Sequence, residues 1–434
     1  MKKIAFSLLF ILISLNFSAQ SADEEVGGYI NDNSFFSLNE KYPVLKNKIQ
    51  SPMLKALSEA LLYSLFNHPE QAVASIDVLV RDYQEEMGFD NVKNMLAWQN
   101  NILFRMGEYC QAAERANSFL EQVAPHLDAE TLDQVRSINR YYNSMCGQKK
   151  SELIRPDKDC EIPIYTKVID LKNFRKGHLL YVPVTIGEKE ERFILDTGCP
   201  GGVFLSEEYA DNLGVKITMD SLRVSGMGGT GWGKMGVLDS LSIGNMTFRN
   251  IVATVTPSDP AIDPILKINA VLGSDIMKLA GEVQIYPKDK KIIFPVKKTP
   301  LPATGQNLMI TGDDLFSVKV YSDKQPLIMH FDTGDSSAGL HYDYYKKHEE
   351  YIKKEGKKTT FMTGGFGGVK ENEYYILPSF PLRIGDKNFV MKDINVGIDP
   401  ITIIAGRDGS LGMSFIDLFD KITISFDQMF VEVE

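Results

Sequence analysis

The sequence predicts a helical region up to about residue 150, followed by a mainly β region. Three observations support this prediction. Before residue 150, apolar residues recur at helical spacing, and after it short β-branched and aromatic runs alternate with glycine-rich turns. The third observation is the tripeptide Asp-Thr-Gly, which follows an apolar, strand-like run at Asp196 and again at Asp332.

The N-terminus has the pattern of a secretory signal peptide. Two lysines precede an apolar run from Ile4 to Leu15, and small residues follow it. We therefore expect a signal peptide over residues 1–21 and an exported protein, located in the periplasm or outside the cell. No later apolar run is long enough to cross a bilayer, so we expect no membrane span.

Charge and cysteine content exclude several classes of function. The net charge is −10 and no basic cluster opposes it, so nucleic acid is not an expected partner. The four cysteines and six histidines lack the spacing of metal ligands, and we expect no metal and no other cofactor. In an oxidising compartment, one disulfide can form among Cys110, Cys146 and Cys160.

Residues 22–150 are expected to be helical. Leu54, Leu57, Leu61 and Leu65 follow helical spacing, and Ser51-Pro52 has the pattern of an N-cap followed by a first-turn proline. The stretches 66–83 and 105–123 each predict a turn and then an amphipathic helix, with Gln-Ala in matching places. Two interpretations stay open: helical hairpins similar to a peptide-binding tetratricopeptide array, or a plain helical packing domain or prodomain.

After residue 150, the sequence predicts β-hairpins. Residues 178–198 predict two strands around a turn that begins at Gly187. Residues 241–255 predict another hairpin, which turns at Gly244-Asn245.

The β region contains two copies of one plan. Each Asp-Thr-Gly is followed, in the same order, by a helix-like segment, a glycine-rich stretch, a hairpin and a segment that ends in two strands. The glycine-rich stretches are 225–233 in the first copy and 362–368 in the second. This order predicts an internal duplication, with a first lobe over residues 160–298 and a second lobe over residues 305–434.

A duplicated Asp-Thr-Gly suits one kind of chemistry. Two carboxylates that face each other cannot both ionise cheaply, so they share a proton and supply one acid and one base at the same pH. Together they can activate a water for attack on a peptide bond without a metal. We therefore expect Asp196 and Asp332 to be the catalytic pair. The residues expected to support them are Thr197, Gly198, Thr333 and Gly334; the glycines permit tight turns and the threonine hydroxyls can bond across to the partner loop.

These motifs resemble those of the aspartic peptidases. The runs FILDTG and MHFDTG are similar to the family's catalytic loops, and AVLG (270–273) and GSLG (409–412) to the segments that cross behind them. The resemblance covers about residues 160–434. It implies a bilobed, aspartic-peptidase-like pair of β-barrels, of retropepsin size but in a single chain, that acts as a monomer on peptide or protein substrates.

The glycine-rich stretches resemble the flaps of this family. The residues that this implies for the flaps and for substrate binding are Gly226, Met227, Gly228, Gly229, Trp232, Gly364, Gly365 and Phe366. The family's flap tyrosine has no clear counterpart. Trp232 and Phe366 are each expected either to close over substrate or to serve a packing role.

Two positions depart from the family pattern. After the glycine, pepsin-like members carry serine or threonine and retropepsins alanine, whereas this chain has Cys199 and Asp335. Cys199 is interpreted either as a small packing residue or as a redox-sensitive switch. Asp335 is expected to turn inward and raise the pKa values of the pair, to point outward, or to cap the following segment as a helix N-terminus.

Three functions are compared on this basis. The first is an aspartic endopeptidase that uses Asp196 and Asp332. The second is a non-catalytic peptide-binding protein that keeps a peptidase-like cleft. The third is a zymogen-like form that the helical domain covers.

Overall fold

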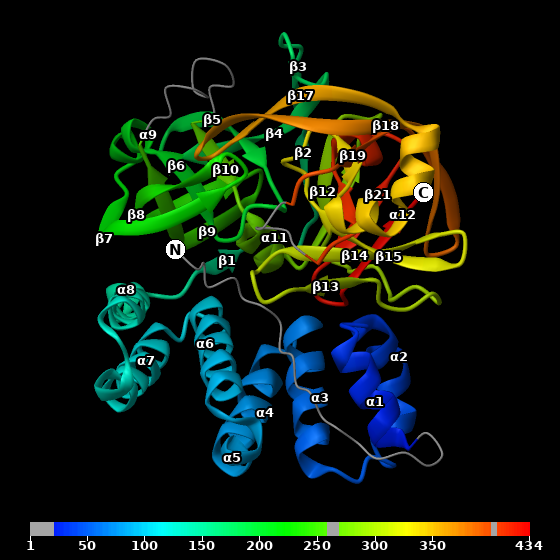
Figure 1. The fold of residues 1–434 in the computed structure, drawn as a ribbon. Coiled ribbons are helices and arrows are strands. Elements are labelled where there is room, and N and C mark those ends of the chain that lie inside the picture. Colours follow the sequence, from blue (N-terminus) through cyan, green and yellow to red (C-terminus); the bar gives the residue numbers. More distant parts are fainter. Residues whose placement is uncertain (1–20, 258–268, 401–405) are drawn as a thin grey trace. The chain divides into compact units, whose positions relative to one another are not determined.

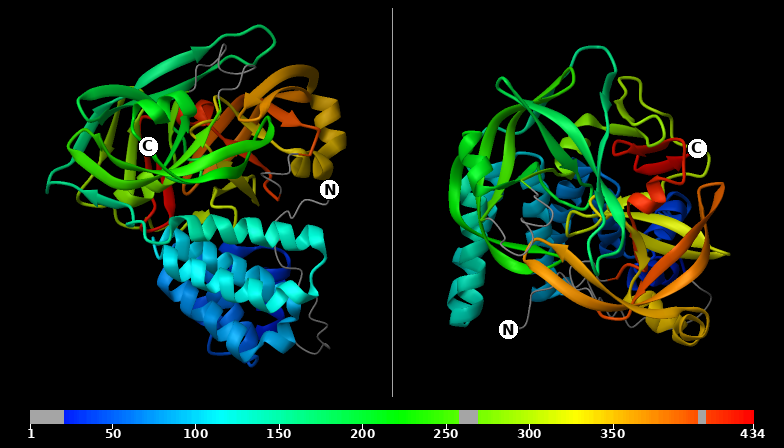
Figure 2. Two further views of the ribbon diagram at one scale, coloured as in Figure 1. Left: turned by 90° about the vertical axis from the view of Figure 1, so that its left-hand side faces the viewer. Right: turned by 90° about the horizontal axis from the view of Figure 1, so that it is seen from above.

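The computed structural model describes residues 21–257, 269–400 and 406–434 (Figures 1 and 2). Its contacts divide the chain into a helical unit that ends at Lys150 and a β unit, Ser151–Glu434. The expected signal peptide, residues 1–21, lies outside the described residues except for Ser21. Within the described ranges, no helix combines the length and apolar character needed to cross a membrane.

The helical unit is a succession of antiparallel helices. Its elements are α1 (Ala22–Asn31), α2 (Phe35–Leu45), α3 (Pro52–Leu65), α4 (Pro69–Asp82), α5 (Gln84–Met87), α6 (Phe89–Arg105), α7 (Tyr109–Val123), the short 3₁₀ helix η1 (Ala124–His126) and α8 (Ala129–Met145). The predicted start of α3 is confirmed, since the Ser51 side chain accepts a hydrogen bond from the Leu54 N–H and Pro52 is the first helical residue. The four leucines that follow helical spacing in α3 are buried.

Three helices, α1, α3 and α6, end in the same kind of turn. In each, a backbone N–H bonds to the carbonyl oxygen five residues earlier, and the residue before that N–H has a positive φ, as in a Schellman motif. The donors are Ser34, His68 and Glu108, and the residues of positive φ are Asn33, Asn67 and Gly107. The unit thus repeats a helix, a turn and a helix, while its similarity to a tetratricopeptide array stays a prediction.

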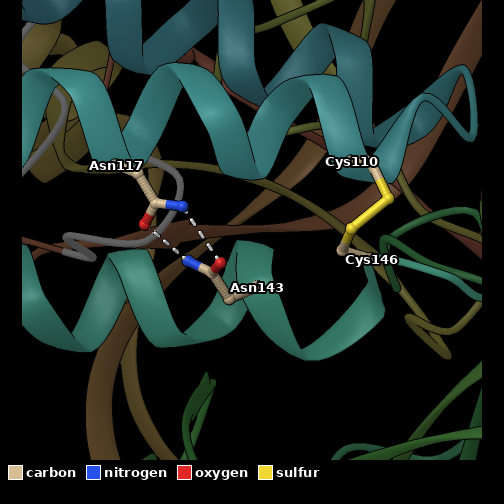
Figure 3. Close-up of a disulfide and its surroundings, with 4 residues drawn as sticks. All are labelled: Cys110, Asn117, Asn143 and Cys146. Carbon is tan, nitrogen blue, oxygen red and sulfur yellow. Dashed lines mark hydrogen bonds between the residues drawn. A yellow bond between two sulfur atoms is a disulfide. The ribbon is translucent and has the colours of Figure 1, made fainter.

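A disulfide joins the last two long helices of this unit. Cys110 in α7 is bonded to Cys146, which follows α8, and Asn117 and Asn143 exchange two side-chain hydrogen bonds between the same helices (Figure 3). The expectation of one disulfide among the first three cysteines is therefore confirmed. The third, Cys160, is buried with its thiol donating to the Ile243 carbonyl oxygen.

Among the described residues, the strands of the β unit form three sheets, of nine, five and eight strands. The nine-stranded sheet is formed mostly by residues 160–298, which are the predicted first lobe. Its strands are β1 (Glu152–Ile154), β3 (Tyr165–Ile169), β4 (Gly177–Ile186), β5 (Lys189–Leu195), β6 (Val203–Ser206), β7 (Lys216–Gly226), β8 (Gly229–Ile243), β9 (Met246–Thr256) and β10 (Ala270–Leu272). Two helices accompany it, α9 (Glu207–Asn212) and α11 (Ser274–Ala280). Strand β8 pairs with both β9 and β4.

The eight-stranded sheet belongs to the second lobe. Its strands are β13 (Leu308–Ile310), β14 (Phe316–Ser322), β15 (Gln325–Phe331), β16 (Ala338–Leu340), β17 (Lys357–Gly365), β18 (Gly368–Ile384), β19 (Lys387–Gly397) and β20 (Gly409–Leu411). Its helices are α12 (Tyr342–Glu355) and α13 (Met413–Ile416). Strand β18 pairs with both β19 and β14.

The five-stranded sheet joins the lobes. Its order is β2 (Cys160–Pro163), β12 (Lys291–Phe294), β11 (Glu282–Tyr286), β21 (Ile422–Ser425) and β22 (Phe430–Val433). The antiparallel pairing of β11 with β21 carries the connection between lobes. The prediction of a mainly β chain after an all-α N-terminal region is therefore confirmed.

Both lobes place a short strand behind the Asp-Thr-Gly loop in the same way. In the first lobe β10 pairs parallel with β5 and antiparallel with β6, and in the second β20 pairs parallel with β15 and antiparallel with β16. These strands carry the AVLG and GSLG motifs. The repeated pairing puts the two Asp-Thr-Gly loops in equivalent positions, each at the end of a buried strand.

The disulfide is expected to stabilise the helical unit, because it closes a loop with a sequence separation of 36 residues. Loop-closure entropy predicts that the double substitution Cys110→Ser, Cys146→Ser lowers its free energy of unfolding by about 3–4 kcal/mol. Urea unfolding followed by fluorescence measures this in a Trp232→Phe background, where Trp98 of α6 is the sole tryptophan. An unchanged urea midpoint would contradict the prediction.

Candidate active site

Asp196 and Asp332 begin equivalent loops, directly after β5 and β15. The Asp196 N–H donates to the Leu272 carbonyl oxygen at 3.0 Å, and the Asp332 N–H donates to the Leu411 carbonyl oxygen, also at 3.0 Å. Leu272 and Leu411 are the last residues of β10 and β20. The strand that passes behind each loop therefore fixes the backbone from which its carboxylate projects.

The threonines tie the two loops together. The Thr197 N–H donates to Thr333 Oγ1, and the Thr333 N–H donates to Thr197 Oγ1, both at 3.0 Å. The Thr197 hydroxyl then donates to the Phe331 carbonyl oxygen at 2.9 Å, and the Thr333 hydroxyl donates to that of Leu195 at 2.6 Å. Both threonines are completely buried. Because this network satisfies each hydroxyl and each amide of the pair, it holds the loops in one register.

Each glycine makes room for the carboxylate of the opposite loop. A Cβ at Gly198 would lie 2.4 Å from Asp332 Cγ, and a Cβ at Gly334 would lie 2.3 Å from Asp196 Cγ. Real side chains cannot approach this closely, so only glycine fits at either position. The structure therefore brings the two carboxyl groups together, each packed against the loop of the other lobe.

Backbone donors also hold the carboxylates. The Gly198 N–H donates to Asp196 Oδ1 and the Gly334 N–H donates to Asp332 Oδ1, both at 2.8 Å. The Asp335 N–H adds a second donor to Asp332 Oδ1 at 3.1 Å. These bonds orient each side chain without occupying both of its oxygens.

The pKa values of the two carboxyl groups are shifted in opposite directions. Burial, and then the charge of Asp332, raise the pKa of Asp196 well above its ordinary value. Burial acts to raise the pKa of Asp332, but the contact with His330, together with hydrogen bonds to Asp196 and from the Gly334 N–H, holds that pKa below its ordinary value. One carboxyl of the pair is therefore protonated while the other is ionised over a range of pH.

His330, in strand β15, lies against Asp332. It is buried, and its Nε2 lies 3.5 Å from Asp332 Oδ2. Histidine spacing in the sequence addresses only metal binding, so it does not predict this contact. A comparison of the two copies contained the signal, because FILDTG has Ile194 where MHFDTG has His330.

Asp335 does not cap a helix, and that alternative is wrong. Its Oδ1 accepts hydrogen bonds from the Ser337 N–H at 2.8 Å and the Ser337 hydroxyl at 3.1 Å, just before strand β16. Helix α12 begins only at Tyr342, after the N-cap residue His341. The segment after Asp335 forms a short polar turn and continues as strand β16, which pairs with β20. Its residues are therefore extended and not helical. Burial and the charge of Asp332 raise the pKa of Asp335 to about 6.

Cys199 packs against an apolar cluster in the first lobe. The buried members of this cluster are Ile169, Leu179, Ile194 and Val271. Burial, and then the charges of Asp196 and Asp332, raise the pKa of the Cys199 thiol well above its ordinary value. Because the thiolate is the reactive form, this environment favours the packing interpretation over a redox switch.

The glycine-rich stretches are the tips of two long hairpins, β7–β8 and β17–β18, and the tips meet. The Gly228 N–H donates to the Phe366 carbonyl oxygen at 3.1 Å. A Cβ at Gly228 would lie 2.2 Å from the Gly368 carbonyl oxygen, and one at Gly226 would lie 2.7 Å from that of Phe366. The backbones of the two hairpins approach this closely only because their tips are glycine.

The other expected flap residues differ in their surroundings. Phe366 packs edge-to-face on Phe204 of the first lobe, with ring centroids 5.6 Å apart, so its packing role is observed. Trp232 is 60% exposed, so this side chain does not lie in the core, and its closing over substrate stays a prediction. Met227 is also exposed. Gly365 and Gly229 lie in the tip contact, and Gly364 lies beside the Phe174 ring.

Asp335 is expected to make stability depend on pH. Its pKa of about 6 in the folded protein lies above its ordinary value, so the neutral carboxyl contributes stability that is present below about pH 4 and is lost as the pH rises to about 6. Asp335→Asn keeps an oxygen acceptor for Ser337 and removes the ionisation. We expect the variant to match the wild type at pH 4 and to exceed its free energy of unfolding at pH 7.5 by on the order of 1–3 kcal/mol.

Denaturant unfolding at the two pH values measures this difference. A difference that is the same at both values would contradict the assignment of Asp335 as an ionisation that opposes folding.

Part of the chain matches a known family. Residues 182–276, which run from within β4 to within α11 and include Asp196, match the aspartyl protease family. No curated protein matches the chain.

Solved structures with a similar fold include basic 7S globulin from soybean (11% identity, TM-score 0.39) and conglutin gamma from lupine seeds (10% identity, TM-score 0.38). Each comparison covers 64% of this chain and 94% of the other. A retropepsin-like aspartic protease from Rickettsia conorii is also similar (19% identity, TM-score 0.21), over 33% of this chain and 92% of that one. The family match in the first lobe, together with the paired loops described above, makes this β unit aspartic-peptidase-like.

Proposed function

We propose that this chain is an aspartic endopeptidase that hydrolyses peptide bonds with a water activated between Asp196 and Asp332. One observation carries the proposal: each carboxyl packs against the Asp-Thr-Gly loop of the other lobe, and the pKa values of the two are displaced in opposite directions. The aspartyl protease family match over residues 182–276 supports it.

The opposite pKa shifts of Asp196 and Asp332 suggest a different catalytic role for each carboxyl group. Ionised Asp332 removes a proton from the water, whose oxygen bonds to the carbonyl carbon of the peptide, while neutral Asp196 donates its proton to the carbonyl oxygen. In the tetrahedral intermediate, Asp332 passes its proton to the nitrogen, and the C–N bond breaks. As the C–O double bond reforms, a hydroxyl proton returns to Asp196. One peptide bond and one water become a carboxylic acid and an amine, and the pair regains its starting protonation.

The flap hairpins are proposed to hold the substrate as an extended strand. Their tips are bonded to each other through Gly228 and Phe366, so substrate entry requires this contact to open. An extended peptide can then pair with backbone groups of the hairpins, in the manner of an added strand. We propose peptides or proteins as substrates and a monomer as the active form, because one chain supplies both carboxyls.

We also propose that the protein is exported. The pattern of residues 1–21 supports this, as does the disulfide between Cys110 and Cys146, since disulfides persist in oxidising compartments.

Cleavage of a mixed peptide library by residues 22–434 tests the proposal across acidic to neutral pH. We expect Asp196→Asn and Asp332→Asn each to lower kcat/KM by at least about 100-fold, because each removes one proton carrier of a pair that acts as a unit. Unchanged cleavage in either variant would contradict a shared site. Binding of library peptides without cleavage by the folded wild type would favour the non-catalytic peptide-binding alternative.

Gly334→Ala tests the packing of the pair. The new Cβ would lie 2.3 Å from Asp196 Cγ, so the carboxyl has to move, and we expect a loss of activity of at least about 100-fold. Gly312→Ala is the matched control in the same lobe, since a Cβ there meets nothing within 4 Å, and it is expected to keep wild-type kcat/KM. Full activity in Gly334→Ala would contradict the close packing of Asp196 on the second loop.

A further inference from the structure

The two halves of the candidate site differ at one pair of equivalent positions. In the first lobe, Ile194 lies two residues before Asp196 and packs in the apolar cluster with Val271 of β10. In the second lobe, His330 lies two residues before Asp332, and its register partners are Ser410 of β20 and Ser317 of β14. The strand residues next to the first loop, which carries Asp196, are therefore apolar, whereas those next to the second loop, which carries Asp332, are polar.

The hydrogen bonds of His330 fix where its protons lie. Nδ1 is 3.1 Å from the Phe316 carbonyl oxygen, which can only accept, so Nδ1 carries a proton. Nε2 faces Asp332 Oδ2 at 3.5 Å. If neither of these two atoms carried a proton, a nitrogen lone pair would face an oxygen lone pair in a buried place. One proton must therefore lie between Nε2 and Oδ2, held by the imidazole or by the carboxyl.

The groups around His330 leave Asp332 as its partner. His341, at the start of α12, is kept neutral because burial lowers its pKa to about 3, and its Nε2 lies 2.8 Å from the Ser410 hydroxyl. Arg407, which precedes β20, is paired with Asp313 at 2.9 Å and bonds to Ser317. The other nearby acidic group, Asp335, uses Oδ1 to accept both bonds from Ser337. No other cation among the described residues lies against Asp332 in an ion pair.

We propose that His330 is a positioning residue that breaks the two-fold symmetry of the carboxyl pair. By holding a proton against Asp332 Oδ2, it favours the ionised form of Asp332 and leaves the shared proton on Asp196. Asp332 is thereby fixed as the base that activates water, and Asp196 as the acid. This inference rests on the proposed peptidase function for its catalytic meaning, but the proton between His330 and Asp332 is a separate structural claim.

The first test uses the chain's own first lobe as the template. His330→Ile places the first-lobe residue in the second lobe and removes the imidazole that holds the proton against Asp332 Oδ2, so we expect the acid limb of the pH profile of kcat/KM to move upward by about 1–3 pH units. Ser410→Val, which copies Val271, is the matched control; it changes the same polar cluster and is expected to leave the limb in place. An unmoved acid limb in folded His330→Ile would overturn the proposal.

A second variant keeps the proposal testable if His330→Ile does not fold. His330→Gln keeps a donor near Asp332 but no charge, and we expect its acid limb to lie between those of the wild type and His330→Ile. If His330→Gln is folded and its limb coincides with that of the wild type, the proposal is overturned even where His330→Ile does not fold.

A measurement without substrate separates this inference from the peptidase proposal. In protein with ¹⁵N-labelled histidine, a proton held between Nε2 and Oδ2 is shielded from solvent and should give a low-field resonance bonded to His330 Nε2. We expect it in the wild type and in Ser410→Val, but not in Asp332→Asn, where the amide replaces the charged partner. Its persistence in Asp332→Asn would overturn the inference. Its presence in a wild type that cleaves no peptide would support the proton position while contradicting the proposed function.

Discussion

The reciprocal hydrogen bonds between Thr197 and Thr333 are the constraint on which the rest of the β unit depends. They are completely buried and join loops that are more than a hundred residues apart in the chain. Because each threonine both donates and accepts, neither loop can shift without leaving a buried polar group unpaired. With the loops held in this one register, β10 and β20 pass behind them and β11 pairs with β21 in the five-stranded sheet. The tips of the two flap hairpins are also in contact.

Within that register, the two Asp-Thr-Gly loops supply two carboxyl groups in equivalent positions, and the residues around these groups differ. The apolar support of Ile194 and Cys199 lies on the side of Asp196, whereas His330 lies against Asp332. Symmetry alone would leave the shared proton divided between the two groups. Under the proposed function, this difference of residue type before the two aspartates favours Asp196 as the acid and Asp332 as the base.

Much of this was predictable from the sequence where the signal is local. The Ser51 cap, the hairpins at Gly187 and Gly244, and the two Asp-Thr-Gly copies depend on neighbouring residues, and the structure has each of them in its expected place. The partner of Cys110 depends on how α7 and α8 pack, which spacing does not determine. The turn at Asp335 and the contact of His330 depend on strands that are distant in sequence, so no local pattern predicts them.

The most direct test of the account is a ¹³C NMR titration of the Asp196 and Asp332 carboxyls, assigned with Asp196→Asn and Asp332→Asn. A pair that shares one proton titrates in two coupled steps. The account predicts one step below the ordinary aspartate value and one well above it. The upper step should be absent in Asp196→Asn and lowered, but still above the ordinary value, in Asp332→Asn, where the burial of Asp196 remains. Two independent titrations near the ordinary value of about 4 would contradict a single site built from both lobes.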